Sequence, residues 1–327
     1  MRKLSIIVPA YNEEDVVEIF YKETKDVLQK INLEYEIIFI DDGSKDNTLK
    51  KLKELRKLDN KINIISFSRN FGKEAGIYAG LSNCVGDLAV VMDADLQNNP
   101  KILMQMLKYI DEGYDTVTTI RNRKYEPKIK SFFARAFYKL MKSANGIELN
   151  EGSQDFRMMT RQVVDAILEL KEYNRFSKGI FSWVGFKTKY IEVENRKRAA
   201  GKTKWSLWGL TKYAIEGITS FTVKPLKIAT IGGIIISALS LILAIEIVIQ
   251  TLIMGKDVPG YASTITSVLF IGGIQLITIG ILSEYVGKIY LEIKKRPQYI
   301  IKEKITGEEK DEQNNSRIQR TNKIFFK

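Results

Sequence analysis

Two aspartates lie where a buried strand is expected to end, and their spacing suits a divalent metal held beside a diphosphate. Residues 88–92 read LAVVM, and residues 93–97 follow directly as DADLQ. Carboxylates with few other protein ligands suit Mg²⁺ or Mn²⁺, which complete their shells with water and substrate phosphate oxygens. An Asp-x-Asp at such a place is also typical of a turn or a helix N-cap, so the motif alone leaves both interpretations open.

The composition narrows the available chemistry. The 327-residue chain contains no histidine and one cysteine, Cys84. Ser-His-Asp triads, Cys-His nucleophiles, imidazole metal ligands and intramolecular disulfides are therefore excluded. Catalysis must rely on carboxylates, cations or a metal ion, and Cys84 is interpreted as a small residue at a helix end in a reducing compartment.

The net charge of +12 favours an anionic partner. A nucleic acid, a membrane surface and phosphorylated substrates all fit this charge. The sequence has no zinc-ligand spacing, basic heptad or aromatic RNA-binding strand, so no nucleic-acid partner is predicted. The basic segments adjoin apolar ones, which favours a lipid bilayer, and the N-terminus lacks the pattern of a signal peptide.

The elements that must position the aspartates alternate between strand and helix patterns. Strands are expected at residues 4–8, 36–40, 62–67, 88–92 and 116–119, with helices at 13–30, 45–58 and 73–82. This alternation predicts an α/β domain with a mostly parallel sheet. Ligands of such sheets bind beyond the carboxyl ends of the strands. The polar clusters at residues 9–13 (PAYNE), 41–44 (DDGS) and 93–95 (DAD) are therefore expected to share one crevice.

Two long apolar stretches predict a transmembrane hairpin, with spans at about residues 228–253 and 263–285. Glu246 is the only charged residue of the first stretch, and residues 263–283 carry no charge. Each is long enough to cross a hydrocarbon core of about 30 Å. Two buried core helices are the alternative. Glu246 is expected either to face a helix partner or to lie at the outer end of its span.

The charges that flank the hairpin predict its orientation. Positive residues precede the first span and follow the second, whereas the joining turn at 255–260 has one charge of each sign. These positive residues are Lys212, Lys224, Lys227, Lys288, Lys294, Lys295 and Arg296. Basic flanks mark the cytoplasmic side, so the chain is expected to be a multi-pass cell-membrane protein with its main domain and both termini in the cytoplasm.

Basic and aromatic residues also mix at helical spacing near residues 126–145 and 204–221. Such helices are expected either to lie in the headgroup layer or to pack on the α/β domain. The predicted domains are then residues 1–200 (catalytic, including the segment near 126–145), 201–226 (interfacial helix), 227–290 (hairpin) and 291–327 (polar cytoplasmic tail).

Six motifs in one order resemble a known family. They are SIIVPAYNEE at 5–14, DDGSKD at 41–46, SRNFGK at 68–73, DADLQ at 93–97, GSQDFR at 152–157 and RAAGKTKW at 198–205. With the hairpin, they resemble family 2 glycosyltransferases of the A-type (Rossmann-like) fold, in the polyprenyl-phosphate group that contains bactoprenol glucosyltransferase and dolichol-phosphate mannose synthase. The resemblance covers residues 3 to about 297.

The resemblance implies roles for individual residues. The nucleotide-binding residues would be Pro9, Tyr11, Glu13, Asp41, Asp42 and Asp93. The ligands of Mg²⁺ or Mn²⁺ would be Asp93, Asp95 and Gln97, with Asp95 and Asp155 as the catalytic residues. Phosphate groups of the acceptor or the diphosphate would contact Arg121, Arg135, Arg198 and Lys204. Residues 98–100 read NNP where relatives commonly have DPP, a change expected to alter the next helix start.

The implied reaction transfers a hexose from a nucleotide-diphospho-sugar to polyprenyl (undecaprenyl) phosphate with inversion. UDP-glucose is the first choice of donor, with UDP-N-acetylglucosamine or GDP-mannose as alternatives. The lipid phosphate is already ionised at neutral pH, so no histidine base is required. Asp155 would take a residual proton or position the acceptor. Other open interpretations are an N-cap role for Asp155 before a helix at 156–170, a turn at Asp41 and Asp42, and either nucleotide contact or loop structure for Arg69, Asn70 and Lys73.

Three rival functions stay open at this point. A processive polysaccharide synthase would need a Gln-x-x-Arg-Trp motif and more membrane helices, neither of which the sequence contains. A non-catalytic membrane scaffold or transport subunit would not need the acidic clusters. A soluble nucleotide-sugar enzyme would use the apolar hairpin for oligomer packing. Relatives imply a homo-oligomer.

Overall fold

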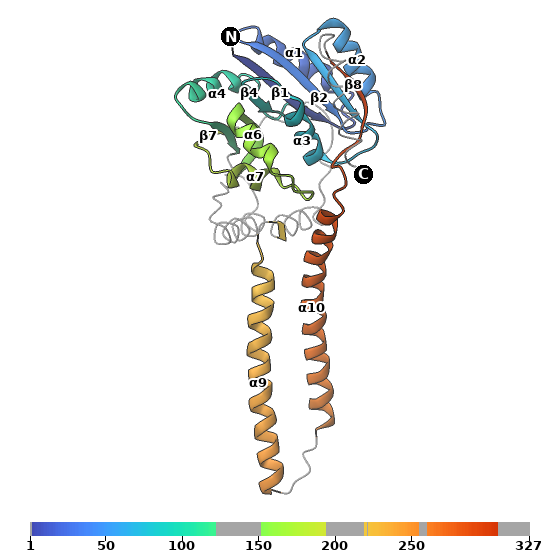
Figure 1. Cartoon of the computed structure of the whole chain (residues 1–327), viewed down its shortest axis with the longest axis vertical. Coiled ribbons are helices and arrows are strands. Elements are labelled where there is room, and N and C mark those ends of the chain that lie inside the picture. Colours follow the sequence, from blue (N-terminus) through green and yellow to red (C-terminus); the bar gives the residue numbers. More distant parts are fainter. Residues whose placement is uncertain (1, 122–151, 194–218, 221, 255–259, 307–327) are drawn as a thin grey trace.

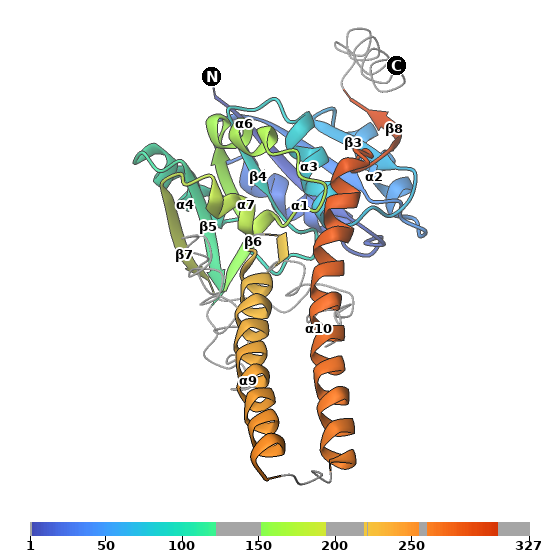
Figure 2. The same ribbon diagram turned by 60° about the horizontal axis from the view of Figure 1, so that its bottom comes forward.

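The computed structural model describes residues 2–121, 152–193, 219–220, 222–254 and 260–306. In these ranges an α/β domain lies at one end and two long helices project from it (Figures 1 and 2). Arg135, Arg198 and Lys204 lie outside the described residues, as do residues 126–145 and most of the predicted interfacial helix. Arg121 ends a strand, and its side chain is also outside the description.

The strands form one sheet. Their bounds are β1 Lys3–Ala10, β2 Glu34–Asp41, β3 Ile62–Phe67, β4 Leu88–Val91, β5 Thr116–Arg121, β6 Ser153–Thr160, β7 Thr188–Val193 and β8 Ile301–Ile305. The order across the sheet is β7-β5-β6-β4-β1-β2-β3-β8. β1 pairs in parallel with β2 and β4, as do β2 with β3 and β5 with β7. β6 and β8 run antiparallel to their neighbours. The predicted mostly parallel sheet is confirmed.

Helices cover both faces of this sheet. Their bounds are α1 Val17–Leu28, α2 Thr48–Leu58, α3 Lys73–Asn83, α4 Ile102–Asp111, α6 Arg161–Glu169 and α7 Ser177–Trp183. One apolar core contains residues of α1, α2 and α4, and the other contains residues of α3, α6 and α7. In β1, Ile6 and Val8 belong to the first core and Ile7 to the second, and all three are fully buried. Burial on both faces explains why the strands read as nearly continuous apolar runs.

Two sequence-based expectations are wrong. Residues 153–160 form strand β6, so Asp155 does not cap a helix at 156–170, and the helix α6 begins only at Arg161. Residues 301–305 form strand β8 beside β3, so the polar tail predicted for 291–327 does not begin at residue 291. In both cases the pairing partner is far away in the sequence, which local patterns do not reveal.

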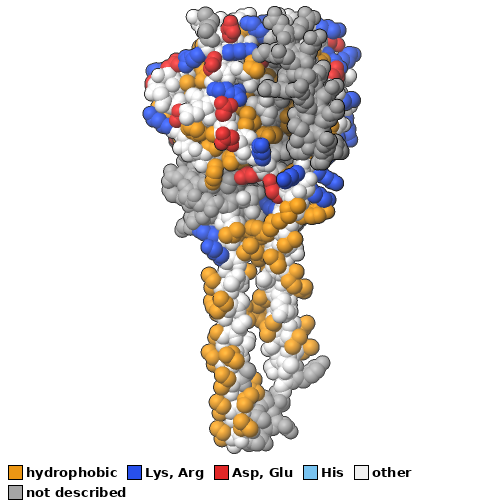
Figure 3. Space-filling model, viewed as in Figure 1, with side chains coloured by type: hydrophobic (Ala, Val, Ile, Leu, Met, Phe, Trp, Pro, Cys, Tyr) orange, Lys and Arg blue, Asp and Glu red, His pale blue; other side chains and the backbone are white. Residues whose placement is uncertain are grey.

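The hairpin consists of α9 (Lys224–Met254) and α10 (Tyr261–Ile293). Both are long and apolar enough to cross a membrane, and none of their apolar windows is buried by the protein. Figure 3 shows hydrophobic side chains along the outer surfaces of both helices. Buried core helices would be covered, so that alternative is wrong.

Several contacts fix the end of α10 to the α/β domain. The Glu292 carboxylate accepts a hydrogen bond from the Tyr173 amide at 3.0 Å. The Tyr299 ring stacks on Phe67 with centroids 4.9 Å apart. β8 then continues directly into the sheet, so the second membrane helix and the sheet edge are joined by seven residues between Ile293 and Ile301.

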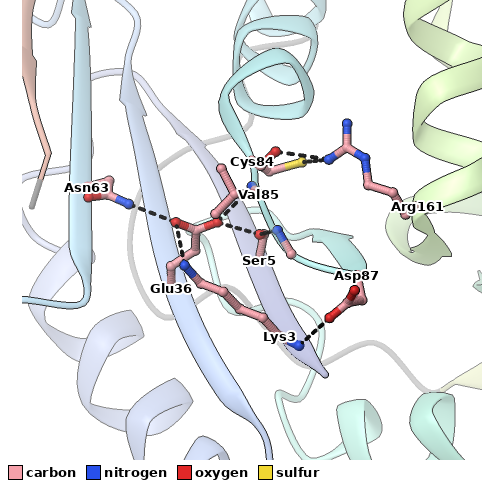
Figure 4. Close-up of polar contacts among 9 residues, drawn as sticks. Lys3, Ser5, Glu36, Asn63, Cys84, Val85, Asp87 and Arg161 are labelled. Carbon is pink, nitrogen blue, oxygen red and sulfur yellow. Dashed lines mark hydrogen bonds and ion pairs between the residues drawn. The ribbon is translucent and has the colours of Figure 1, made fainter. Parts of the chain in front are cut away.

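A buried carboxylate holds the opposite, amino-terminal side of the sheet together (Figure 4). Glu36 of β2 accepts hydrogen bonds from Ser5 Oγ at 2.6 Å, Asn63 Nδ2 at 3.0 Å and the Val85 amide at 3.0 Å. Lys3 Nζ lies 3.5 Å from the same carboxylate. Three strands and the loop before β4 therefore meet at one side chain.

Glu36→Ala is expected to lower the free energy of unfolding by about 2 kcal/mol, because it leaves the buried Ser5 hydroxyl and the partly buried Val85 amide without an acceptor. Chemical unfolding of the full chain in detergent measures this loss. The matched control is Glu34→Ala, since Glu34 is exposed on the same strand. Equal midpoints for the two variants would contradict the prediction.

Candidate active site

The candidate site lies at the carboxyl ends of the parallel strands. The ends of β1, β2 and β4 bring residues 9–13, 41–44 and 93–97 to one edge of the sheet. β6 runs antiparallel to β4 with Arg157 opposite Val91, so its first residues start at this same edge. Asp155 and Asp93 therefore lie close enough for Lys73 to contact both, a proximity that the sequence motifs alone did not reveal.

Hydrogen bonds connect the loop after β1 to the loop after β2. The Asn12 amide donates to Ser44 Oγ at 3.0 Å, and Asn12 Oδ1 accepts from the Lys45 amide at 2.8 Å. Asn12 has a φ of 52°, a left-handed conformation that asparagine tolerates better than most residues. The predicted nucleotide-binding residues Pro9, Tyr11 and Glu13 lie next to Asn12 in the chain or within three residues of it, and all three are partly exposed.

Asp41 and Asp42 shape the loops around the site. Asp41 accepts hydrogen bonds from the Ser44 amide at 3.0 Å and from Ser66 Oγ at 2.7 Å. Asp42 accepts from the amides of Phe71 at 2.6 Å and Gly72 at 2.9 Å. Burial raises the pKa of Asp42, and these amide bonds offset only part of that rise. The turn interpretation of Asp41 is confirmed, and a nucleotide contact for either residue stays a prediction.

The DADLQ loop presents its polar residues and buries the others. Ala94 and Leu96 are buried in the first core, whereas Asp93, Asp95 and Gln97 are partly exposed. Asp95 Oδ1 accepts a hydrogen bond from the Gln97 amide at 3.2 Å, which closes a turn. Leu96 has a φ of 56°, an uncommon conformation for a bulky side chain that its burial helps to maintain. The turn interpretation is therefore correct, and it is compatible with a ligand site.

One lysine connects the two acidic motifs. Lys73 Nζ lies 2.6 Å from Asp93 Oδ1 and 2.5 Å from Asp155 Oδ2. Desolvation lowers the pKa of Lys73, but the two carboxylates outweigh it and the pKa lies above its ordinary value. Desolvation likewise raises the pKa of Asp155, but Lys73 and Lys178 outweigh it, so the pKa lies well below the usual range. Asp155 is therefore ionised near neutral pH.

Two further charged residues surround this pair. Arg157 is buried with its guanidinium 4.0 Å from the centre of the Phe181 ring, and burial lowers its pKa to about 10. Glu74 accepts hydrogen bonds from the amide and hydroxyl of Ser177, which fixes α3 to the start of α7. Burial raises the pKa of Glu74. Neither residue was predicted, and only Arg157 lies within a recognised motif.

The acidic residues fit a metal that arrives with a phosphorylated substrate. Across the described ranges, no three His, Cys, Asp or Glu residues gather closely enough to hold an ion by themselves. Asp93, Asp95 and Gln97 nevertheless supply two carboxylates and an amide at one partly exposed turn. Mg²⁺ is usually bound by one or two carboxylates together with substrate phosphates and water. The donor set therefore matches the predicted Mg²⁺ or Mn²⁺.

Comparison with known proteins defines the class. Residues 5–168 match the family described as glycosyl transferase family 2, a range that includes both acidic motifs. Together with relatives above 40% identity over most of the chain, this match shows that the chain belongs to glycosyltransferase family 2. Residues 224–289 match a second family, described as the GtrB C-terminal hairpin, which supports membrane association.

Three relatives narrow the group. CsbB of Bacillus subtilis (strain 168), named as a provisional glycosyltransferase, is 44% identical over 92% of this chain and 91% of its own. The uncharacterized glycosyltransferase sll0501 of Synechocystis is 42% identical over 91% and 94%. The prophage bactoprenol glucosyl transferase homolog of Escherichia coli (strain K12) is 42% identical over 92% and 98%. The resemblance to the polyprenyl-phosphate group is confirmed.

Proposed function

We propose that this enzyme transfers a hexose, with UDP-glucose as first choice of donor, to polyprenyl phosphate at the cytoplasmic face of the cell membrane. The observation that supports this most is the meeting of Asp93 and Asp155 at one lysine. A donor motif and an acceptor motif thus lie within one side chain of each other. The similarity to bactoprenol glucosyl transferases supports glucose and the lipid acceptor.

The reaction is a single displacement. An oxygen of the lipid phosphate attacks the anomeric carbon, the new C–O bond forms with inversion, and the nucleoside diphosphate leaves with the electrons of the broken C–O bond. Asp155 positions the acceptor or takes its residual proton. Asp93, Asp95 and Gln97 would hold Mg²⁺ or Mn²⁺, which when bound supplies positive charge to the leaving diphosphate.

The hairpin explains the choice of a lipid acceptor. A polyprenyl chain leaves the bilayer only at a cost of about 0.8 kcal/mol per methylene, so the enzyme must work at the membrane surface. Figure 2 shows β6 beginning on the side of the domain from which α9 leaves. Lys224 and Lys288 lie at the domain ends of α9 and α10, which supports a cytoplasmic domain with both termini inside. Homo-oligomer formation stays a prediction.

A donor panel tests this function. Membranes containing the enzyme are incubated with undecaprenyl phosphate, Mg²⁺ and radiolabelled UDP-glucose, UDP-N-acetylglucosamine or GDP-mannose. We expect label in the organic phase with UDP-glucose, and only when the lipid phosphate is added. Transfer from one of the other donors instead would show that the transferred sugar is not glucose. No transfer from any donor would favour the scaffold or transport alternative.

Removal of divalent metal with EDTA is expected to reduce transfer at least about 100-fold, because the leaving diphosphate loses its counter-charge. Addition of excess Mg²⁺ or Mn²⁺ should restore the rate, and Ca²⁺ serves as a comparison ion. A rate unchanged by EDTA would contradict the assignment of Asp93, Asp95 and Gln97 as metal ligands.

A further inference from the structure

We propose that Lys73 is a phosphate-binding residue of the active site, whose ammonium group hydrogen-bonds a substrate phosphate oxygen while Asp93 and Asp155 hold it in place. This inference rests on the proposed function and adds a residue to it. The sequence left Lys73 open between nucleotide contact and loop structure, and none of the comparisons assigns it a role.

The geometry leaves one donor of Lys73 for a ligand. An ammonium group has three N–H donors, and the two carboxylates accept two of them at 2.6 and 2.5 Å. Among the described residues no other partner contacts this ammonium. The Lys73 side chain is 42% exposed, so it is not enclosed by protein and a ligand can approach its third donor.

The backbone around Lys73 is fixed from both sides. Asp42 accepts hydrogen bonds from the Phe71 and Gly72 amides immediately before it. Glu74, immediately after it, is bound to Ser177 of α7. Lys73 is also the first residue of α3, where the helix dipole favours an anion. A lysine held this firmly at an exposed position is arranged for a ligand.

Stability alone does not account for this arrangement. In the Lys73–Asp93 pair the side chains are 42% and 33% exposed, and ion pairs between such exposed groups contribute little to folding. Lys178 and Arg157 add positive charge around Asp155, and Glu74 adds negative charge. The local charge is therefore nearly balanced. Because net charge then attracts a phosphate only weakly, a direct N–H donor is the feature that would bind it.

Two phosphates can supply that oxygen. One is the diphosphate of the nucleotide-sugar, on the side of Asp93, and the other is the monophosphate of the lipid, on the side of Asp155. The chemistry is the same in both cases, a charge-assisted N–H···O bond, and each source predicts a different binding defect.

The test measures binding to the full-length protein in nanodiscs with Mg²⁺. UDP is compared with uridine, and undecaprenyl phosphate with undecaprenol, so that each pair differs in phosphate. Lys73→Met is expected to weaken the binding of UDP or of undecaprenyl phosphate by about tenfold or more. The binding of the matching phosphate-free compound should stay unchanged. Lys73→Arg should restore part of the affinity. Lys57→Met, at the exposed far end of α2, is the control for loss of one charge.

The outcomes separate the possibilities. Weaker UDP binding assigns Lys73 to the donor, and weaker lipid-phosphate binding assigns it to the acceptor. The proposal is overturned if Lys73→Met binds both phosphate compounds as tightly as Lys57→Met does. It is also overturned if Lys73→Met weakens the binding of uridine as much as that of UDP. Should Lys73→Met fail to fold, Lys73→Gln replaces it under the same criteria. A wild-type protein that binds neither phosphate would overturn the proposed function itself, which no Lys73 variant could show.

Discussion

Asp155→Asn is expected to lower kcat by about 10³-fold, the size of effect typical of a lost catalytic carboxylate. The amide has nearly the same volume as the carboxylate, but it cannot take a proton and lacks the charge that faces Lys73 at 2.5 Å. Transfer by the purified enzyme in nanodiscs, with saturating donor and varied undecaprenyl phosphate, measures this effect.

The same measurement separates the two roles left open for Asp155. A base would affect kcat with little change in the KM for the lipid, whereas a positioning group would affect both constants. Asp165→Asn is the control, because Asp165 is an exposed residue of α6 that pairs only locally with Arg161. If both variants keep kcat within about threefold of the wild type, Asp155 has no catalytic role.

Asp95→Asn is expected to reduce kcat/KM for the nucleotide-sugar by about 100-fold or more, because a charged metal ligand is replaced by a neutral one. Asparagine retains an oxygen that can accept the Gln97 amide, so the turn that closes the loop should remain. Leu96 and Ala94 should keep the loop in place through their burial.

The defect in Asp95→Asn should depend on the metal. Raising the Mn²⁺ concentration is expected to recover part of the rate, since weaker binding is offset by mass action. The control is Asp111→Asn. Asp111 is an exposed residue of α4 whose carboxylate lies 2.7 Å from the Arg2 guanidinium. A loss of activity that Mn²⁺ cannot change at any concentration would argue that Asp95 acts in some other way.

The local pattern of apolar and polar residues was sufficient to predict the central strands and the helices between them. The runs at 4–8, 36–40, 62–67, 88–92 and 116–119 all lie within observed strands or extend one residue beyond them. Strands buried on both faces are continuous apolar segments, and those are the clearest signal in a single sequence. The alternation with helices then fixes a parallel arrangement.

Elements with distant partners were not predictable in this way. β8 reads IKEKI, a charged segment that resembles a tail. It joins the sheet because β3 offers a free edge, with Lys53 Nζ 2.6 Å from the Glu303 carboxylate. β6 contains polar residues and runs into α6 without a turn signal at Thr160, so a helix over 156–170 was a natural but wrong interpretation.

The candidate site was predicted as a set of motifs but not as a set of contacts. The acidic residues came from the sequence and the resemblance, whereas their connection through Lys73 required the fold. Asp155 lies 82 positions from Lys73 in the chain, and antiparallel pairing of β6 with β4 is what brings them together. Spacing along a sequence carries no information on such a pairing.

The position of β8 has a consequence for biosynthesis. During translation, β3 is made early and its outer edge stays open until the chain has passed through both apolar helices and residues 301–305 emerge from the ribosome. An open strand edge is a site of aggregation. A chain that stops before residue 301 would therefore leave the outer edge of β3 unprotected, so the strand that protects it is supplied only near the end of synthesis.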